Sequence, residues 1–259
     1  MTLTINLVNA MWAGPSGWPA SIWRSLPALG ITLAFGLVAW GMRGVTARGA
    51  LAGSVVTFAI CLAAGIGGFL TVLTVFVLTL FATRFGLHRK LALGIAERRE
   101  GRRGSQVLAN LSAAGLSAFP AIFYPRTAPL LLAAMTAALC EAAADTVSSE
   151  IGQAAGRRAY LITTFNSVTA GTDGGITAPG SLAGAAAALL VAAVASSFSV
   201  IPEGWLLPVA IAGFVGMLFD SLLGATLQRP GRLGNDAVNF LSTVFAAAAT
   251  LAYGLFLMS

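Results

Sequence analysis

The sequence predicts an all-α integral membrane protein of about eight transmembrane helices. Of its 259 residues, 57% are hydrophobic and only 9% are charged, whereas a soluble domain carries about 25% charged residues. The mean hydropathy is +0.86. Apolar stretches near the roughly 20 residues that cross a bilayer recur along the whole chain. These observations exclude an ordinary soluble enzyme.

The predicted spans follow one another with short connections. They lie at 25–42, 50–65, 66–84, 106–124, 128–147, 181–200, 205–226 and 236–258. The second stretch is short and meets the third at Gly65-Ile-Gly-Gly68, where glycines favour a tight turn. Seven spans is the alternative, with 50–65 re-entrant. Cys61 and Cys140 fall inside spans and predict neither a disulfide nor a CxxC site.

The basic residues predict how the helices are oriented. The loops after the first, third, fifth and seventh spans hold thirteen Arg and Lys residues, and the opposite face holds only Arg24 and Arg126. Basic loops stay on the cytoplasmic side. We therefore expect a bacterial inner or plasma membrane protein with both termini outside. The isoelectric point near 10.4 reflects this bias, so no nucleic-acid partner is expected.

Two decapeptides 131 residues apart suggest an internal repeat. Gly44-Val-Thr-Ala-Arg-Gly-Ala-Leu-Ala-Gly53 and Gly175-Ile-Thr-Ala-Pro-Gly-Ser-Leu-Ala-Gly184 share seven of ten positions, and each opens an apolar span. Weaker echoes pair Gln106–Asn110 with Asn235–Asn239, and Leu80–Thr83 with Leu218–Ser221. We predict a single membrane domain of two parallel four-helix halves, 1–127 and 128–259, with the site between them. The alternative is that glycine- and alanine-rich helix starts resemble one another.

Acidic residues at the end of the fifth span indicate a functional site. Glu141, Asp145 and Ser149 are spaced four residues apart and share one helix face, and Glu150 follows them. An ionisable residue at membrane depth is a functional candidate by default, and two carboxylates on one stripe need a cation or a proton. The alternative is structural pairing with arginines. Asp220, in the seventh span, is the expected partner of this stripe.

A polar, glycine-rich loop leads into the sixth span. It reads Asn166-Ser-Val-Thr-Ala-Gly-Thr-Asp-Gly-Gly-Ile-Thr177. Glycines let backbone amides approach an anion, and a following helix N-terminus favours negative charge. The loop is not a Walker motif, and a hinge between the halves is the alternative. Asp236 is a candidate helix cap, while Asn110 and Asn239 are candidates for hydrogen bonds between helices.

Every polar cluster lies at the cytoplasmic end of its span. A channel or transporter usually needs polar groups near the midplane, so this asymmetry favours an enzyme that takes a soluble reactant from the cytosol and a lipid from the bilayer. Carboxylates suit Mg²⁺, while arginines and glycine amides suit phosphates, as in phosphoryl or nucleotidyl transfer.

The same motifs resemble a known family. They are Arg48–Gly53, Gln106–Asn110, Asp145–Gly152, Asn166–Thr177, Asp220–Gln228 and Asn235–Asn239, in this order between Gly41 and Phe240. The chain is identified as a member of the membrane-protein family that includes transmembrane protein 19 and the plant phytyl-phosphate kinase. The resemblance implies a kinase that converts an isoprenyl monophosphate such as phytyl or geranylgeranyl phosphate to the diphosphate, with CTP or ATP as the donor.

On this hypothesis each candidate residue has a role, and Mg²⁺ is the expected cofactor. The metal-binding and catalytic candidates are Asp145, Glu150, Asp220 and Asp236, with Glu141 in support. The candidates for binding nucleotide and phosphate are Asn110, Ser149, Asn166, Thr169, Gly171, Thr172, Asp173, Gly174, Gly175, Ser221, Gln228, Asn235, Asn239, Arg43, Arg48 and Arg84. The alternatives are a lipid-phosphate transporter or flippase and a nucleotidyltransferase that forms a CDP-lipid. The sequence predicts no oligomeric state.

Overall fold

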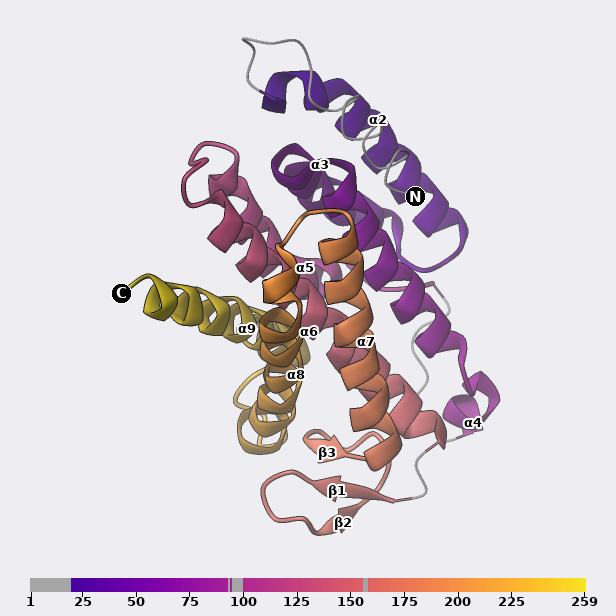
Figure 1. Ribbon diagram of the computed structural model, residues 1–259. Helices are drawn as coiled ribbons and strands as arrows, with labels where there is room; N and C mark the ends of the chain where they lie inside the picture. The colour runs from indigo at the N-terminus through magenta and orange to yellow at the C-terminus, as the bar shows by residue number, and fades with distance from the viewer. Residues whose placement is uncertain (1–19, 93, 95–99, 156–157) are drawn as a thin grey trace.

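Helix α6 (Ala128–Ala155) forms the centre of the fold. The computed structural model describes residues 20–92, 94, 100–155 and 158–259. Every residue of α6 from Ala133 to Ala144 is buried, because α3, α5, α7, α8 and α9 all pack against it (Figure 1). A helix that is apolar on all sides belongs inside a bundle, and its many alanines let the neighbouring backbones approach closely.

The surrounding helices account for most of the chain. They are α2 (Ala20–Gly41), α3 (Ala47–Arg84), α4 (Leu87–Ala92), α5 (Gly104–Ala121), α7 (Ala178–Ser197), α8 (Leu206–Leu223) and α9 (Asn235–Met258). A 3-10 turn, η1 (Glu203–Trp205), precedes α8, and a π-helical turn, η2 (Gly224–Gln228), follows it. The prediction of an all-α membrane protein is confirmed. Five helices in the described residues are long and apolar enough to cross a membrane, and the apolar part of α2, Ser25–Gly41, is shorter.

Helix α3 contains the turn that the sequence predicts at Gly65. A straight helix of its 38 residues would be about 57 Å long, roughly twice the hydrocarbon thickness of a bilayer. Gly65 instead has φ 61° and ψ −149°, a conformation that glycine adopts without steric cost. Ser54 and Val75, one on each side of the break, line the same cavity, so the two halves of α3 lie side by side. The count of eight crossings stays a prediction.

A small sheet replaces part of the predicted glycine-rich loop. Strands β1 (Ala159–Leu161), β2 (Ser167–Val168) and β3 (Gly175–Ile176) pair antiparallel in the order β2-β1-β3. The sheet lies at one end of the bundle, below α7 in Figure 1. These strands were not predicted, because strands of two or three residues are too short to show an alternating pattern in the sequence. The sheet holds the segment between β2 and β3 against the helix ends.

The two decapeptides adopt the same local structure. Thr46 and Thr177 are the N-caps of α3 and α7, and their side chains accept hydrogen bonds from Gly49 N at 3.2 Å and Gly180 N at 3.1 Å. A Cβ at either glycine would lie within 2.6 Å of a backbone carbonyl oxygen. The shared cap and close contact give a physical reason for the sequence echo. The division into 1–127 and 128–259 stays a prediction.

Candidate functional site

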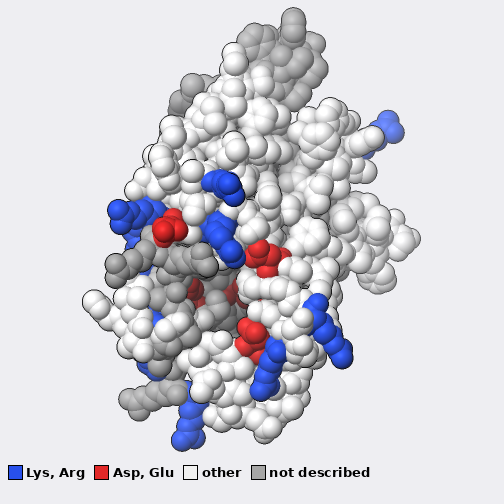
Figure 2. All heavy atoms as spheres, turned by 180° about the vertical axis from the view of Figure 1, so that it is seen from behind, with Lys and Arg blue, Asp and Glu red and all other residues white. Residues whose placement is uncertain are grey.

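A polar cavity of about 460 Å³ opens where α5, α6, α8 and α9 meet the β2–β3 segment. Figure 2 shows this face, where acidic and basic side chains gather around a hollow. The cavity brings together most of the predicted site residues. These are Asn110, Asp145, Ser149, Glu150, Gly171, Thr172, Asp173, Gly174, Gly175, Asp220, Ser221, Gln228, Asn235 and Asn239.

Asp145 and Asp220 line this cavity from different helices. Asp145 comes from α6 and Asp220 from α8, and both are half-buried. Ser242 Oγ donates a hydrogen bond to Asp220 Oδ2 at 3.1 Å, which fixes that carboxylate from α9. Arg102 lies near enough to Asp145 for an electrostatic interaction. The sequence-based expectation that Asp220 partners the stripe on α6 agrees with this geometry.

Glu141 lies one helical turn before Asp145 and is only 1% exposed. One of its carboxylate oxygens, Oε1, has no hydrogen-bond partner among the described residues, and an unpartnered buried polar atom is costly. Gly216 of α8 faces it, and a Cβ there would lie 2.7 Å from Glu141 Cγ. Glu141 therefore lies below the cavity, close to Asp145 and Asp220, and does not line it.

The carboxylates fit Mg²⁺ only when phosphate completes the ligand set. Among the residues that the structure describes, no three Asp, Glu, His or Cys side chains are grouped to hold a metal ion. Mg²⁺ is usually bound by one or two carboxylates together with substrate phosphates and water. Asp145 and Asp220 match that pattern, and the unpartnered oxygen of Glu141 lies behind them. The sequence suggested Asp145, Glu150, Asp220 and Asp236 for Mg²⁺, with Glu141 in support, and this assignment stays a prediction.

The glycine-rich segment is joined to the ends of α8 and α9. Gln228 Nε2 donates to Asp173 Oδ1 at 2.9 Å and lies 3.5 Å from Asn235 Oδ1. Gly174 has φ 76°, and a Cβ there would collide with Ala225. Both Ala225 and Gln228 belong to the π-turn η2, and such turns are frequent at functional sites. Burial raises the pKa of Asp173 above its ordinary range, and the nearby Arg229 opposes this shift.

Asn110 and Asn239 connect α5 to α9 at the cavity wall. Asn239 Nδ2 donates to Asn110 Oδ1 across a long 3.5 Å contact, while Asn110 Nδ2 donates to Gln106 O at 2.8 Å. The hydrogen bond between helices that the sequence suggested is therefore present. Both side chains also line the cavity, so this structural role does not exclude phosphate contact.

Four predicted residues, from α3, α9 and the segment around β2, line neither cavity. Asp236 stands in the first turn of α9, where a negative charge favours the helix dipole. Asn166 and Thr169 are exposed on either side of β2, and Thr169 O accepts a hydrogen bond from Thr172 Oγ1 at 2.8 Å. Arg48 is exposed on the first turn of α3. These positions leave their predicted phosphate or metal contacts without support from the geometry.

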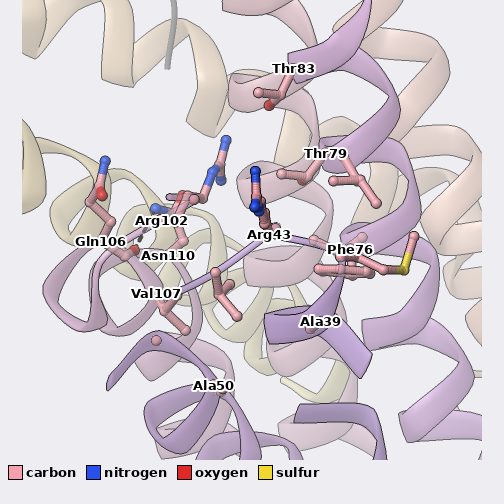
Figure 3. Close-up of a pocket in the computed structure, with 18 of the residues that line it drawn as sticks. Ala39, Arg43, Ala50, Phe76, Thr79, Thr83, Arg102, Gln106, Val107 and Asn110 are labelled. Atoms are coloured by element: carbon pink, nitrogen blue, oxygen red, sulfur yellow. Dashed lines mark hydrogen bonds between the residues drawn. The ribbon is translucent and has the colours of Figure 1, made fainter. Parts of the chain in front are cut away.

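Arg43 and Arg84 lie at a neighbouring, mostly apolar cavity (Figure 3). Arg84 Nη2 donates to Met42 O at 2.8 Å. Arg102, which the prediction did not include among the site residues, lines both cavities, and its Nη1 donates to Thr146 Oγ1 at 3.3 Å. In the sequence, Arg102 was counted only among the basic loop residues that predict the orientation of the helices in the membrane. Its position just before the motif that begins at Gln106 is the signal that could have identified it.

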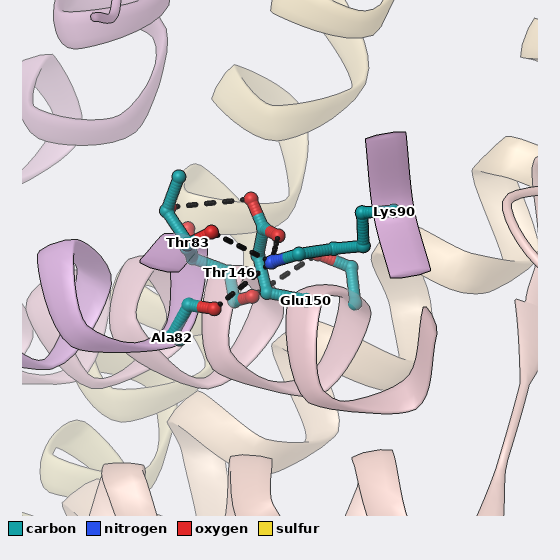
Figure 4. Close-up of polar contacts among 6 residues, drawn as sticks. Ala82, Thr83, Lys90, Thr146 and Glu150 are labelled. Carbon is teal, nitrogen blue, oxygen red and sulfur yellow. Dashed lines mark hydrogen bonds and ion pairs between the residues drawn. The ribbon is translucent and has the colours of Figure 1, made fainter. Parts of the chain in front are cut away.

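The predicted metal ligand Glu150 has protein partners instead (Figure 4). Lys90 of α4 is 0% exposed, and its Nζ donates to Glu150 Oε2 at 2.5 Å, to Thr83 O at 2.7 Å and to Ala82 O at 3.1 Å. Thr83 Oγ1 donates to Glu150 Oε1 at 3.2 Å. Both carboxylate oxygens are thus engaged. A buried charge is normally paired, which explains why Glu150 tolerates burial without a metal.

Comparison with known proteins places the chain among membrane proteins. Residues 30–247 match the family described as integral membrane protein DUF92. An uncharacterized membrane protein of Synechocystis sp. is 36% identical over 73% of this chain and 74% of its own length. Protein VTE6, chloroplastic, of Arabidopsis thaliana is 35% identical over 78% of this chain, which spans 62% of that relative.

A third relative is similar to most of the chain. An uncharacterized membrane protein of Methanocaldococcus jannaschii is 34% identical over 76% of this chain and 80% of its own length. No solved structure matches the chain.

Proposed function

The chain belongs to the integral membrane protein family DUF92, and from that premise we propose that it is a membrane-embedded kinase. It transfers a phosphoryl group from a nucleoside triphosphate to an isoprenyl monophosphate. The observation that carries the proposal is the polar cavity, in which Asp145 and Asp220 face a glycine-rich segment and a set of amide side chains. The likeness to VTE6 over most of this chain and the motif resemblance to the plant phytyl-phosphate kinase support it.

The reaction needs little covalent chemistry from the protein. An oxygen of the acceptor phosphate attacks the γ-phosphorus, the bond from that phosphorus to the β–γ bridging oxygen breaks, and a nucleoside diphosphate leaves. The acceptor is already an ionised phosphate, so no separate base is required. Catalysis of this kind depends on positioning and charge neutralisation.

The lining residues have the chemistry that such positioning needs. Asp145 and Asp220 would hold Mg²⁺, which when bound neutralises phosphate charge. Backbone amides of the segment 171–175 would bind the donor phosphates, and the guanidinium of Arg102, which lines both cavities, would lie between the donor and acceptor phosphates. Gln106, Asn110 and Asn239 would orient phosphate oxygens through their side-chain amides.

We propose that the cavity faces the cytosol, where nucleotides are abundant. The arginines of this face support the assignment, because basic loops stay on the cytoplasmic side. With an even number of crossings, both termini then lie on the outer side. Reaction of single cysteines introduced at Ser259 and Arg229 with a membrane-impermeant thiol reagent in intact cells tests this. Labelling of Arg229→Cys without Ser259→Cys would overturn it.

Transfer itself is tested with purified protein in detergent, Mg²⁺ and geranylgeranyl or phytyl monophosphate. Label from γ-labelled CTP or ATP should appear in the lipid diphosphate on a thin-layer plate. Label from α-labelled CTP in the lipid would indicate a CDP-lipid-forming nucleotidyltransferase instead. No transfer to either lipid from either nucleotide would overturn the proposal and leave transport as the alternative.

A further inference from the structure

A second cavity lies beside the polar one and differs from it in character. It encloses about 330 Å³ between α2, both halves of α3 and α5, within the range of about 300–1,000 Å³ for small-molecule pockets. Its walls are mainly apolar, and Figure 3 labels Ala39, Ala50, Phe76 and Val107 among them. Along α3 it extends from Val72 to Thr83, about 16 Å of helix.

The two cavities meet at the start of α5. Arg102, Gln106 and Asn110 line both of them. The same residues are therefore within reach of a group in the apolar cavity and of one in the polar cavity. A molecule with an apolar body and a charged end could occupy both spaces, with the charged end at Arg102.

Positive charge gathers at the polar end of the apolar cavity. Arg43, Arg84 and Arg102 all belong to its lining, and Figure 3 shows the Arg43 nitrogens and Arg102 at the end away from Ala50. Within the described residues, no carboxylate lies within ion-pair distance of these three side chains. Arg43 has φ 57°, the left-handed conformation that commonly ends a helix, and this helix end places Arg43 at the cavity.

We infer that the apolar cavity holds the isoprenyl chain of the acceptor, and that Arg43, Arg84 and Arg102 hold its phosphate. The inference rests on the proposed function, because it names the acceptor of that reaction. The chain would lie along α3, and the phosphate would reach the polar cavity at Arg102. Apolar walls with a cationic end complement a lipid that is apolar except for one phosphate.

Gly53 offers a direct test. It lines the apolar cavity, and a Cβ there would lie 3.6 Å from Val107 Cγ1, an ordinary contact. In Gly53→Leu the rest of the side chain would fill part of the cavity. Gly30→Leu is the matched control, because Gly30 is also in a helix, has no atom of the described residues within 4 Å of its Cβ position and does not line the cavity. Leucine favours helix over glycine at both positions.

Binding is measured in detergent without nucleotide, using geranylgeranyl monophosphate and the shorter geranyl monophosphate. Gly53→Leu should weaken the binding of geranylgeranyl monophosphate at least tenfold and the binding of geranyl monophosphate by a smaller factor. Gly30→Leu should bind both lipids as the wild type does. Arg43→Gln should weaken both lipids by a similar factor, because it removes a phosphate contact. Unchanged binding in Gly53→Leu, or no binding by the wild type, overturns the inference.

The same experiment separates this inference from the kinase proposal. Chain-length-dependent binding without phosphoryl transfer would support the cavity assignment and overturn the kinase. Transfer with the same KM for geranylgeranyl monophosphate in Gly53→Leu and wild type would support the kinase and overturn the cavity assignment. Equal competition by phosphatidic acid would overturn the isoprenyl assignment, because it would show a general lipid-phosphate site.

Discussion

Replacing Lys90 by methionine should destabilise the protein strongly. The ammonium of Lys90 is fully buried and donates to Glu150, Thr83 and Ala82. Methionine keeps the apolar stem but removes all three hydrogen bonds, and it leaves the Glu150 carboxylate in a site where its side chain is only 10% exposed. Removing one partner of a buried ion pair costs about 3–5 kcal/mol, so we expect a loss of that size in the free energy of unfolding.

A variant that removes both charges tests the same reasoning. In Lys90→Met/Glu150→Leu neither charge remains, and replacing a buried pair by apolar residues is often neutral. The double variant should therefore recover most of the stability lost in Lys90→Met. The matched control is His88→Met, because His88 is exposed on the same short helix and its replacement should change stability by less than about 0.5 kcal/mol.

Unfolding of the purified protein in detergent, followed by tryptophan fluorescence, gives the free energies, and the transfer assay gives activity. A loss below about 1 kcal/mol in Lys90→Met, or a double variant no more stable than Lys90→Met, would refute the reasoning. Activity in the folded double variant would show that Glu150 is structural. A folded but inactive double variant would restore the sequence-based prediction of a metal ligand.

Three further predictions concern the cavity and its loop. Asp145→Asn and Asp220→Asn should each lower kcat at least about 100-fold without a change in Tm. The control is Glu203→Gln, which is exposed in η1 and should keep the wild-type kcat. Retained turnover in both Asn variants would remove these residues from the site. Gly174→Ala should destabilise the protein by more than the roughly 1–2 kcal/mol that a left-handed conformation costs, because its Cβ would also collide with Ala225. Gly231→Ala measures the cost of the left-handed conformation alone, because Gly231 has φ 78° and no atom of the described residues within 4 Å of its Cβ position. Equal losses of unfolding free energy in the two variants would contradict the contact with Ala225. The raised pKa of Asp173 means that the folded protein binds a proton there more tightly than the unfolded chain, so this group's stabilising contribution falls as pH rises from the ordinary Asp range through the raised pKa. Asp173→Asn should remove that part of the pH dependence of Tm between pH 3 and pH 8, and identical profiles would refute the assignment.

The sequence predicted the elements whose signals are local. Apolar length located the helices, and the break at Gly65 followed from three glycines in four residues. The spacing of Glu141, Asp145 and Ser149 placed two carboxylates on one helix face, and one of them, Asp145, lines the polar cavity. Polar residues in otherwise apolar helices have few alternative explanations, which is why most of the candidate site could be named before the fold was known.

The features that were missed depend on contacts between distant segments. Lys90 lies among arginines in sequence, yet it reaches Glu150, 60 residues away. The π-turn at Gly224–Gln228 has no recognisable composition, and its close contact with Gly174 depends on the sheet. The apolar cavity could not be predicted either, because apolar residues that line a cavity and those that pack in a core have the same sequence pattern.

The predicted duplication offers one account of why two unlike cavities adjoin. When the similar segments Leu80–Thr83 and Leu218–Ser221 are aligned, Ala82 of the first half corresponds to Asp220 of the second half. Ala82 is buried, and its carbonyl accepts from Lys90, so the first half has no acid at that position. Ala82 itself does not line the apolar cavity, and none of the described residues that line that cavity is a carboxylate. Asp145 and Asp220 of the second half line the polar cavity. Asn110 and Asn239, at equivalent places in the weaker echo, meet where the two cavities join. A duplicated helical unit in which one copy kept the acids and the other lost them would provide adjacent sites for a charged donor and an apolar acceptor.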